Sequence, residues 1–487
     1  MKKILYRVMC TVLTFVVVLP FSSCNKKAET WTTESTKLND QNATKKEATT
    51  ITFAVPESCF IDASHLKLFN ELLIDDGHNY QLEIKHLESE NYTMNLENEL
   101  KNGNVDIAFL GLGDGSNNII RLINSGLILN LDEPLLSDAG QAVYESFPKA
   151  LWESVKCNGR IYSIPNANAD DQGIYAAFNR NYIGDDVIDS WDGSIEGIYE
   201  IIKNVKWNDE VSPRFQYLLT DYTFDKMIRC EIRNGLLYDY DTMKIENPLE
   251  SDKLCKFLST LEQMKSDGFM SESVTYYYNT SYDNEMKNLE SGKFLVALAV
   301  GEPHRFFTNN NIRIKKITPY LSSRINGSIG ISKNTNNVDV IMDFLGLLYG
   351  EEKYGNTLMY GKQDEDYKLE DGLVVNMDGS DAADNYLTKL YLNLFINIHP
   401  IKGERYTDHR REEYFSFYNS VKLSPFIGFE ADEASESAIT KDLDSFLDSL
   451  AYKPLNKAIN DYSKKLKSDG IDEYLSSVKK QWEDFQQ

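Results

Sequence analysis

The stretch Gly159–Ile183, GRIYSIPNANADDQGIYAAFNRNYI, constrains the fold more than any other part of this chain. It begins with apolar residues that alternate as in a strand, and Pro165 ends that strand because proline cannot donate a hydrogen bond to a ladder. A polar run, Asn166–Gln172, follows, and a second apolar run begins at Ile174. The pattern predicts an extended segment that leaves one apolar core and enters another, with a ligand held beside the crossing.

Alternating strand and helix patterns precede this crossing. Ile51–Val55 and Val105–Leu110 are apolar runs of strand length, and apolar residues at helical spacing lie between them. Such alternation implies an open, mostly parallel α/β sheet. Because ligands of such sheets bind beyond the carboxyl ends of the strands, the segments Pro56–Ser58 and Gly111–Asn118 are candidate site loops.

The part of the chain after the crossing is longer and more helical. Phe294–Val300, FLVALAV, predicts a buried strand, and we interpret Phe294–Arg305 as a return crossing to the first core. A short strand within Asn326–Ser332 and an amphipathic helix from Val338 to Tyr349 follow. From Leu443 to Phe485 the apolar residues recur at helical spacing, which predicts a helical C-terminal region.

The N-terminus has the pattern of a secretory signal. Cations precede a short apolar run, Val8–Phe21, which is too short for a membrane span, and small residues lead to Cys24. We expect residues 1–23 to be a signal peptide and residues 24–50, which have little to bury, to be a lipidated N-terminus and flexible tether. FSSC resembles the bacterial lipobox, so Cys24 would carry acyl chains that anchor the protein on the outer face of the cell membrane. The alternative is plain secretion.

Composition and cysteine spacing exclude several classes of function. The chain has 487 residues, a formal net charge of −24 and 42% hydrophobic residues. This is a globular composition, and the negative charge argues against a nucleic-acid partner. No cysteine pair has CxxC spacing, so we expect neither a metal site nor a cofactor. Cys230 and Cys255 either form a disulfide or remain separate buried thiols.

Several motifs, in this order, resemble the extracellular solute-binding proteins of family 1, the receptors of ABC sugar importers. VDIAFLGL is similar to the family's first site strand and loop, GRIYSIPNANADDQGIYAAFNRN to its crossing, and LESGKFLVALAVGEPHR to its return crossing. MYGKQDEDYKLEDG and KLKSDGIDEYLSSVKKQWEDF resemble a lipoprotein branch that is linked to complex carbohydrates and carries a C-terminal extension. Where that branch has "EG" before "DY", this chain has Asp364-Glu365.

The resemblance implies a two-lobe α/β fold of the type II periplasmic-binding-protein-like class, with a hinged interlobe cleft and a helical C-terminal region. Lobe 1 would comprise residues 51–165 and 301–335, and lobe 2 residues 166–300 and 336–487. The lobes would close on the ligand by hinge motion. The expected partners are a carbohydrate ligand, which we expect to be an oligosaccharide, and the permease subunits of an ABC importer. The expected state is a monomer.

A sugar site needs planar donors and acceptors together with aromatic platforms, because buried hydroxyl groups without partners are costly. The candidate ligand-binding residues on the predicted loops and crossings are Asp114, Asn166, Asp170, Asp171, Trp191, Tyr222, Tyr276, Glu302, His304 and Arg305. Several of these residues have a structural alternative. The three aromatic residues can pack in a core, Arg305 can pair with Glu302, and Asn166, Asp170 and Asp171 can form a solvated turn or hinge. No second histidine lies at ligand spacing from His304.

Two other functions are compatible with a lipid-anchored two-lobe protein. One is a surface enzyme that cleaves glycans, and the other is a ligand receptor for a membrane sensor kinase. The carboxylates of a glycosidase flank the scissile bond at about 5 to 9 Å, which adjacent residues such as Asp170 and Asp171 rarely achieve. The chain contains neither a G-x-S-x-G elbow nor an H-E-x-x-H motif. We therefore expect a binding protein without catalytic residues.

Overall fold

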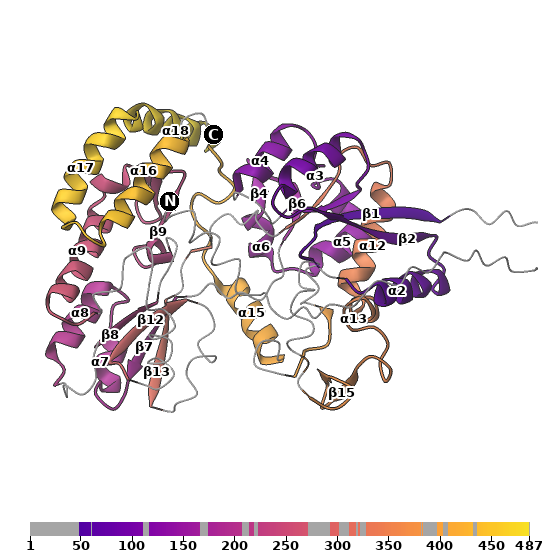
Figure 1. The fold of residues 1–487 in the computed structure, drawn as a ribbon, viewed down its shortest axis with the longest axis horizontal. Coiled ribbons are helices and arrows are strands. Elements are labelled where there is room, and N and C mark those ends of the chain that lie inside the picture. The colour runs from indigo at the N-terminus through magenta and orange to yellow at the C-terminus, as the bar shows by residue number, and fades with distance from the viewer. Residues whose placement is uncertain are drawn as a thin grey trace, which may run out of the picture. The chain divides into compact units, whose positions relative to one another are not determined.

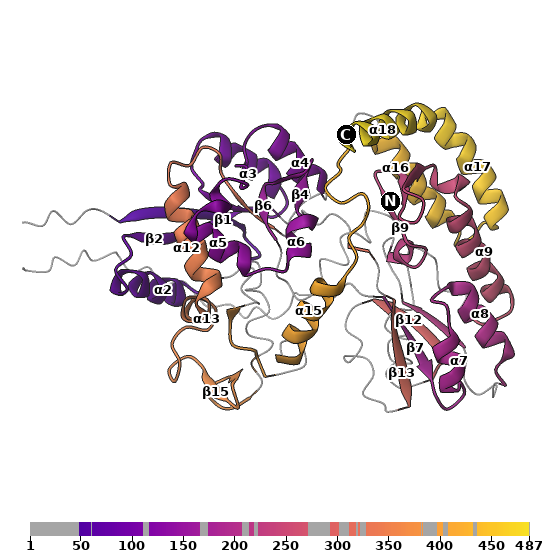
Figure 2. The ribbon, with the colours of Figure 1, turned by 180° about the vertical axis from the view of Figure 1, so that it is seen from behind.

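A computed structural model describes residues 48–59, 61–110, 116–165, 174–206, 214–218, 223–270, 293–300, 311–317, 320–321, 328–380, 382, 397–402, 408–431 and 436–486. These residues lie within one compact unit, Glu47–Gln487. Figure 1 and Figure 2 show the elements from opposite sides. Two main sheets, each with its own helices, organise the described chain, as the sequence predicts for an α/β protein.

The first sheet has five strands in the order β2-β1-β3-β14-β6. Its strands are β1 (Thr49–Pro56), β2 (Tyr80–Leu87), β3 (Ile107–Phe109), β6 (Ser163–Ile164) and β14 (Ile329–Ile331). β1 runs parallel to β2 and β3, whereas β14 runs antiparallel to β3 and β6. The carboxyl ends of β1, β2, β3 and β6 therefore share one edge of the sheet, and β14 starts at that edge.

Helices cover this sheet because their apolar stripes need a partner surface. α2 (Ala63–Asp75) begins after Asp62, whose side chain accepts the backbone N–H of Ser64, and the helix buries Phe69 and Leu73. The elements that follow in this half, as far as the first crossing, are α3 (Tyr92–Lys101), α4 (Ser116–Asn124), η1 (Pro134–Leu136), α5 (Asp138–Glu145), α6 (Lys149–Ser154), β4 (Lys156–Cys157) and β5 (Arg160–Ile161).

The second sheet has four strands in the order β13-β7-β12-β8. Its strands are β7 (Ile174–Asn179), β8 (Phe215–Leu218), β12 (Val296–Val300) and β13 (Ile312–Ile317). β7 runs antiparallel to both of its neighbours, and β8 runs parallel to β12. The predicted strands on both sides of the first crossing are thus confirmed, since β6 belongs to one sheet and β7 to the other.

Around the second sheet lie helices and a small three-stranded sheet, in the order β11-β10-β9. These elements are α7 (Asp185–Ser190), α8 (Ile195–Asn204), η2 (Thr223–Lys226), β9 (Cys230–Arg233), β10 (Leu236–Asp239), β11 (Lys244–Glu246), η3 (Pro248–Glu250) and α9 (Asp252–Ser266). The predicted helical C-terminal region is confirmed as α16 (Glu436–Ser449), α17 (Leu455–Ser468) and α18 (Ile471–Phe485). Buried side chains of all three helices belong to the core of this second half.

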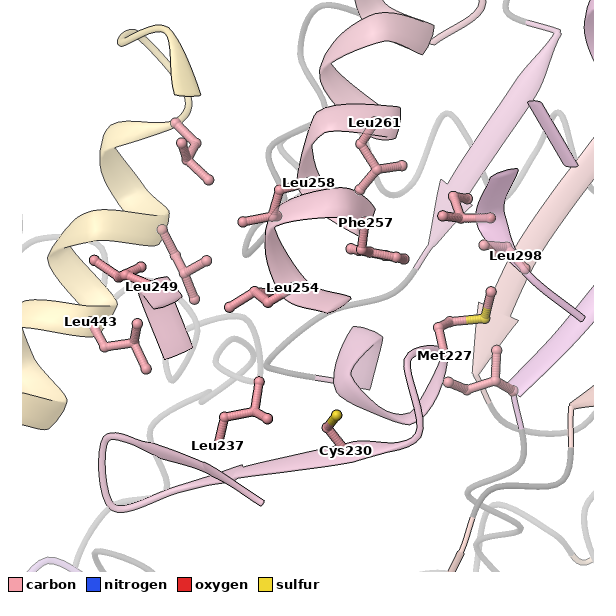
Figure 3. Packing of buried hydrophobic residues seen from close by; sticks show 14 of the residues in the cluster. Met227, Cys230, Leu237, Leu249, Leu254, Phe257, Leu258, Leu261, Leu298 and Leu443 are labelled. Atoms are coloured by element: carbon pink, nitrogen blue, oxygen red, sulfur yellow. The ribbon is translucent and has the colours of Figure 1, made fainter. Parts of the chain in front are cut away.

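α9 illustrates how sequence spacing creates that core. Its apolar residues recur every three or four positions and are buried together with residues of β12 and α16. Figure 3 shows Leu254, Phe257 and Leu261 projecting from α9 among other side chains of this cluster, which include Met227, Leu298 and Leu443. The described cysteines, including Cys230 and Cys255, are free thiols, so the alternative of separate thiols holds and no Cys230–Cys255 disulfide is formed.

The predicted return crossing at Phe294–Arg305 needs correction. Phe294–Val300 does end in a buried strand, β12, but the next described strand, β13, pairs with β7 in the same sheet. The chain therefore returns to the first sheet only between Ile317 and Ile329. Antiparallel pairing of β13 with β7 decides this, and apolar patterns in the sequence carry no information about which strand will be the partner.

The predicted lobe boundary at residue 336 also differs from the structure. α12 (Val338–Gly350) and α13 (Glu352–Tyr360) bury their apolar faces in the core of the first sheet, not of the second. The segment β15 (Lys368–Glu370), β16 (Leu373–Val375) and α15 (Asp408–Ser420) contributes buried residues to that same first core. The amphipathic stripe of α12 required a partner surface without specifying which one.

Among the helices that the structure describes, none has the length and apolar character of a membrane span.

Candidate functional site

The carboxyl edge of the first sheet carries two of the predicted site segments. Asp114 lies in the segment that follows β3, and Asn166, Asp170 and Asp171 lie in the segment that follows β6. These four residues lie outside the described residues. The antiparallel pairs of Ile329 with Phe109 and with Ile164 place the ends of both strands at one edge.

One edge of the second sheet carries the other predicted loops. Ile174, the first residue of β7, pairs with Val300 on one side and with Ile317 on the other. Leu218 at the end of β8 pairs with Ala299. The segments that leave this edge contain Tyr222, Glu302, His304 and Arg305, which also lie outside the described residues.

Two connections join these same two edges. The first runs from Ile164 to Ile174 and contains the predicted crossing, and the second runs from Ile317 to Ile329. The segments that contain eight of the ten predicted residues therefore follow strands that end at these two edges. This arrangement follows the rule that ligands of open α/β sheets bind beyond the strand ends.

Tyr276 and Trp191 are not rooted at these edges. Tyr276 lies outside the described residues, in the segment between α9 and the start of β12, which is the opposite end of that strand. Trp191 follows α7, and its ring packs edge-on against Phe178 with a centroid distance of 5.2 Å. Its indole N–H donates to the carbonyl of Ser194 at 2.9 Å. For Trp191 the structure thus favours core packing, the alternative that the sequence left open.

Described groups at the first edge extend the candidate site. Glu57 and Ser58 directly follow β1, and both are exposed. The backbone N–H of Glu57 donates to the carbonyl of Leu87 at 2.8 Å, which holds the turn against the end of β2. The segment Pro56–Ser58 was predicted as a site loop, and Glu57 is the ionisable group that it presents at the edge.

A third passage between the two halves runs from α15 through residues 421–431 to α16. It pairs with the second connection, because the N–H of Leu321 donates to Lys422 and the N–H of Ser424 donates to Leu321, both at 2.8 Å. Further along, the carbonyl of Gly428 accepts the N–H of Asn158 at 2.7 Å. This passage therefore has backbone bonds to both the second connection and the first half.

Buried charges hold the end of that passage in the second core. Arg233 of β9 contacts Glu430 with an Nη1–Oε1 distance of 3.1 Å, and their side chains are 10% and 4% exposed. Burial alone would lower the pKa of Arg233, but Glu430 and Glu231 raise it above its ordinary value. The guanidinium also lies 4.7 Å from the ring centroid of Tyr238. Arg233 is therefore charged at every physiological pH.

Asp225 is a buried carboxyl group in η2, the 3-10 helix that precedes the β9 hairpin. Its Oδ2 accepts the N–H of Ile232 at 3.0 Å, while its Oδ1 has no hydrogen-bond partner among the described residues. Burial raises the pKa of this carboxyl to about 7.

A pocket of about 290 Å³ lies elsewhere in the protein. Its lining residues were not predicted, and they are Ile120, Arg121, Asn124, Ser125, Asn158, Glu430 and Ala431. The described residues contain no cluster of His, Cys, Asp and Glu that could hold a metal ion.

Comparisons with known proteins agree with this topology. No protein-family model matches the chain. A carbohydrate ABC transporter substrate-binding protein of Streptococcus pneumoniae serotype 4 is 25% identical over 450 residues, which cover 85% of this chain and 86% of that protein.

Solved structures with the same fold cover nearly the whole chain. The N-glycan transport solute binding protein of Streptococcus pneumoniae is 20% identical, with a TM-score of 0.62 over 90% of this chain and 99% of that one. An extracellular solute-binding protein of Bifidobacterium longum subsp. infantis is 14% identical, with a TM-score of 0.55 over 90% of this chain and 99% of that one. Together with the two-sheet topology, these similarities confirm the predicted resemblance to the extracellular solute-binding proteins.

Proposed function

We propose that this protein is a lipid-anchored extracellular substrate-binding protein that captures a carbohydrate, an oligosaccharide, and delivers it to an ABC transporter. The observation that supports the proposal is the strand register: the strands next to the predicted polar segments end at two sheet edges, and two connections join these edges. A ligand that contacts loops from both edges stabilises the closed state, because only that state offers both sets of contacts.

The names of the similar proteins support a glycan as the ligand. The relative in Streptococcus pneumoniae is named as a carbohydrate ABC transporter substrate-binding protein. The N-glycan transport protein was also solved in complex with Man5GlcNAc, at 20% identity and a TM-score of 0.52 to this chain. We therefore take mannose-containing N-glycan fragments as the first ligands to test.

The direct test is a thermal-shift and calorimetry screen of the soluble body against a glycan panel. A ligand at a hundred times its Kd stabilises the native state by about 2.7 kcal/mol. Unfolding entropy of about 2.1 cal/mol/K per residue converts this to a rise in Tm of about 3 °C for a body of this size. No shift and no heat with any glycan, at concentrations up to millimolar, would refute the proposal.

The crossing supplies a sharper variant. Replacing Asp170 and Asp171 together by Ala should weaken glycan binding at least tenfold, about 1.4 kcal/mol. The matched control is Asp186→Ala, which removes an exposed carboxylate from α7, at the end of β7 far from Ile174. Equal loss of affinity in both proteins would indicate a general charge effect and not a contact at the crossing.

The same screen distinguishes binding from catalysis. A substrate-binding protein leaves the glycan intact, so mass spectrometry of the glycan after incubation should find no product. Product that disappears in Glu302→Ala or in the double aspartate variant would establish the glycan-cleaving alternative.

We further propose that Cys24 carries the lipid anchor and that the residues between Cys24 and β1 tether the folded body to the outer face of the membrane. The tether was predicted to extend to residue 50, but β1 already begins at Thr49. Two acyl chains anchor a protein stably, where one chain does not. Cells that express the full chain should retain it in the membrane fraction, and Cys24→Ala should release it into the medium. Retention of the Cys24→Ala protein in the membrane would contradict the anchor.

A further inference from the structure

Tyr92 is a buried residue at the candidate site that sequence reasoning did not single out. It is the first residue of α3, directly after the loop that leaves the carboxyl end of β2. The residue is 2% exposed. Its hydroxyl group lies 2.7 Å from the carbonyl oxygen of Phe109 and 3.2 Å from that of Ala54.

The Tyr92 hydroxyl group contacts the backbone just beyond the point where the pairing of β1 with β3 ends. β1 and β3 pair at Phe53–Ile107 and Ala54–Ala108, whereas β1 continues to pair with β2 as far as Pro56. The carbonyl of Phe109 lies beyond the last pair of β1 and β3. A hydroxyl group has one proton, and the shorter distance makes the Phe109 carbonyl its principal acceptor. Burial raises the pKa of Tyr92, so this group keeps its proton at physiological pH.

The next residue of the loop root is held from the other side. The N–H of Leu110 donates to the carbonyl of Ser328 at 2.8 Å, just before β14 begins. Phe109 itself pairs with Ile329. Hydrogen bonds therefore hold the end of β3 on both sides, just before the segment with Asp114. Tyr92 bonds to Phe109 on one side, and Leu110 bonds to Ser328 on the other.

We propose that Tyr92 is a positioning residue for ligand binding, which holds the ends of β1 and β3 together so that Pro56–Ser58 and Leu110 leave the sheet in one fixed geometry. This inference rests on the proposed function. Binding groups held by buried hydrogen bonds lose less conformational freedom when the ligand binds, and a loosened root would return that cost to the binding reaction.

Tyr92→Phe removes the hydroxyl group and keeps the ring, so the variant should fold. Tyr354→Phe is the matched control, because the Tyr354 hydroxyl donates to Asp76 at 2.8 Å in the same half of the protein. Tyr354 is 1% exposed, and Asp76 lies before β2, away from the carboxyl edge. Both variants lose one hydroxyl hydrogen bond, so a purely structural role predicts the same behaviour for both.

Two measurements on the full soluble body decide the inference. Tyr92→Phe should weaken binding of whichever glycan the wild type binds by about threefold to tenfold, the range for loss of one hydrogen bond, through faster dissociation. Tyr354→Phe should bind as the wild type does. Without ligand, hydrogen exchange at the Leu110 amide should be faster in Tyr92→Phe and unchanged in Tyr354→Phe.

The outcomes separate the inference from the proposed function. If the wild type binds no glycan, the proposed function fails, and hydrogen exchange at Leu110 still tests whether Tyr92 holds the loop root. If the wild type binds and both variants bind with unchanged affinity, Tyr92 has no positioning role. Equal weakening in both variants would likewise overturn the inference, because it would mark a general loss of stability.

Discussion

Removing Glu430 should destabilise the protein far more than removing a typical surface acid. Glu430 is 4% exposed at the side chain and contacts Arg233, which lies in a hairpin 197 residues away in sequence. After Glu430→Ala, the remaining carboxylate near Arg233 is Glu231, at 4.0 Å from Nε. The Nη2 atom of Arg233 has no hydrogen-bond partner among the described residues, so the variant leaves a buried cation with poor compensation.

The expected loss follows from the cost of an uncompensated buried charge. Breaking a buried ion pair by removing one partner costs about 3–5 kcal/mol. With about 2.1 cal/mol/K of unfolding entropy per residue, the Tm of a body of this size falls by about 3–5 °C. Replacing both partners, as in Arg233→Met with Glu430→Leu, should recover most of this loss, because apolar side chains of similar volume need no partner.

Calorimetry of the wild type, Arg233→Met, Glu430→Leu and the variant with both substitutions forms a double-mutant cycle for this pair. Glu71→Ala is the control, because Glu71 pairs with Lys67 at 3.7 Å and both side chains are more than half exposed. That variant should melt with the wild type. A Glu430→Ala protein with unchanged Tm, or a double variant whose loss equals the sum of the single losses, would refute the reasoning.

Three further predictions concern pH, packing and thiols. The folded-state pKa of Asp225, about 7, lies above its ordinary value of 3.8, so the wild type should lose stability relative to Asp225→Asn as pH rises from about 4 to about 7. Urea midpoints for both proteins at several pH values check this, and parallel profiles would contradict it. A methyl group on Gly140 would overlap the carbonyl oxygen of Pro134, so Gly140→Ala should lower the Tm by several degrees, whereas Gly350→Ala, with nothing within 4 Å, should not. Burial raises the pKa of Cys59 and Cys157 to about 12, so both should react slowly with thiol reagents in the native protein, and reducing agents should leave the Tm unchanged. A Tm that falls on reduction would point to a disulfide instead.

Local patterns sufficed for many individual elements. Strand-length apolar runs predicted β1, β3 and β12, and apolar residues at helical spacing predicted α12 and the C-terminal helices. These predictions succeed because burial of one face imposes a period on the sequence. The rule that ligands bind beyond strand ends also predicted site loops after β3 and β6, and the register shows that these two strands end at one edge.

Pairing over long distances could not be predicted in this way. β13 joined the second sheet and α12 joined the first core, both against the predicted lobe boundaries. Apolar stripes of similar composition can pack on either core, so the stripe states only that a partner surface exists. Trp191 and Tyr92 show the same limit for single residues. The sequence does not distinguish an aromatic side chain that packs in a core from one whose polar group bonds to the end of a strand.

The sequence by itself therefore determined that this chain crosses between two apolar cores at Gly159–Ile183, since alternating and polar runs are local properties of the chain. Tertiary structure alone decided where the chain returns, which strands share an edge, and which hydroxyl and carboxyl groups contact strands from other segments of the chain. Hydrogen bonds such as Tyr92 to Phe109 and ion pairs such as Arg233 to Glu430 form only after distant segments have packed, so no local pattern encodes them.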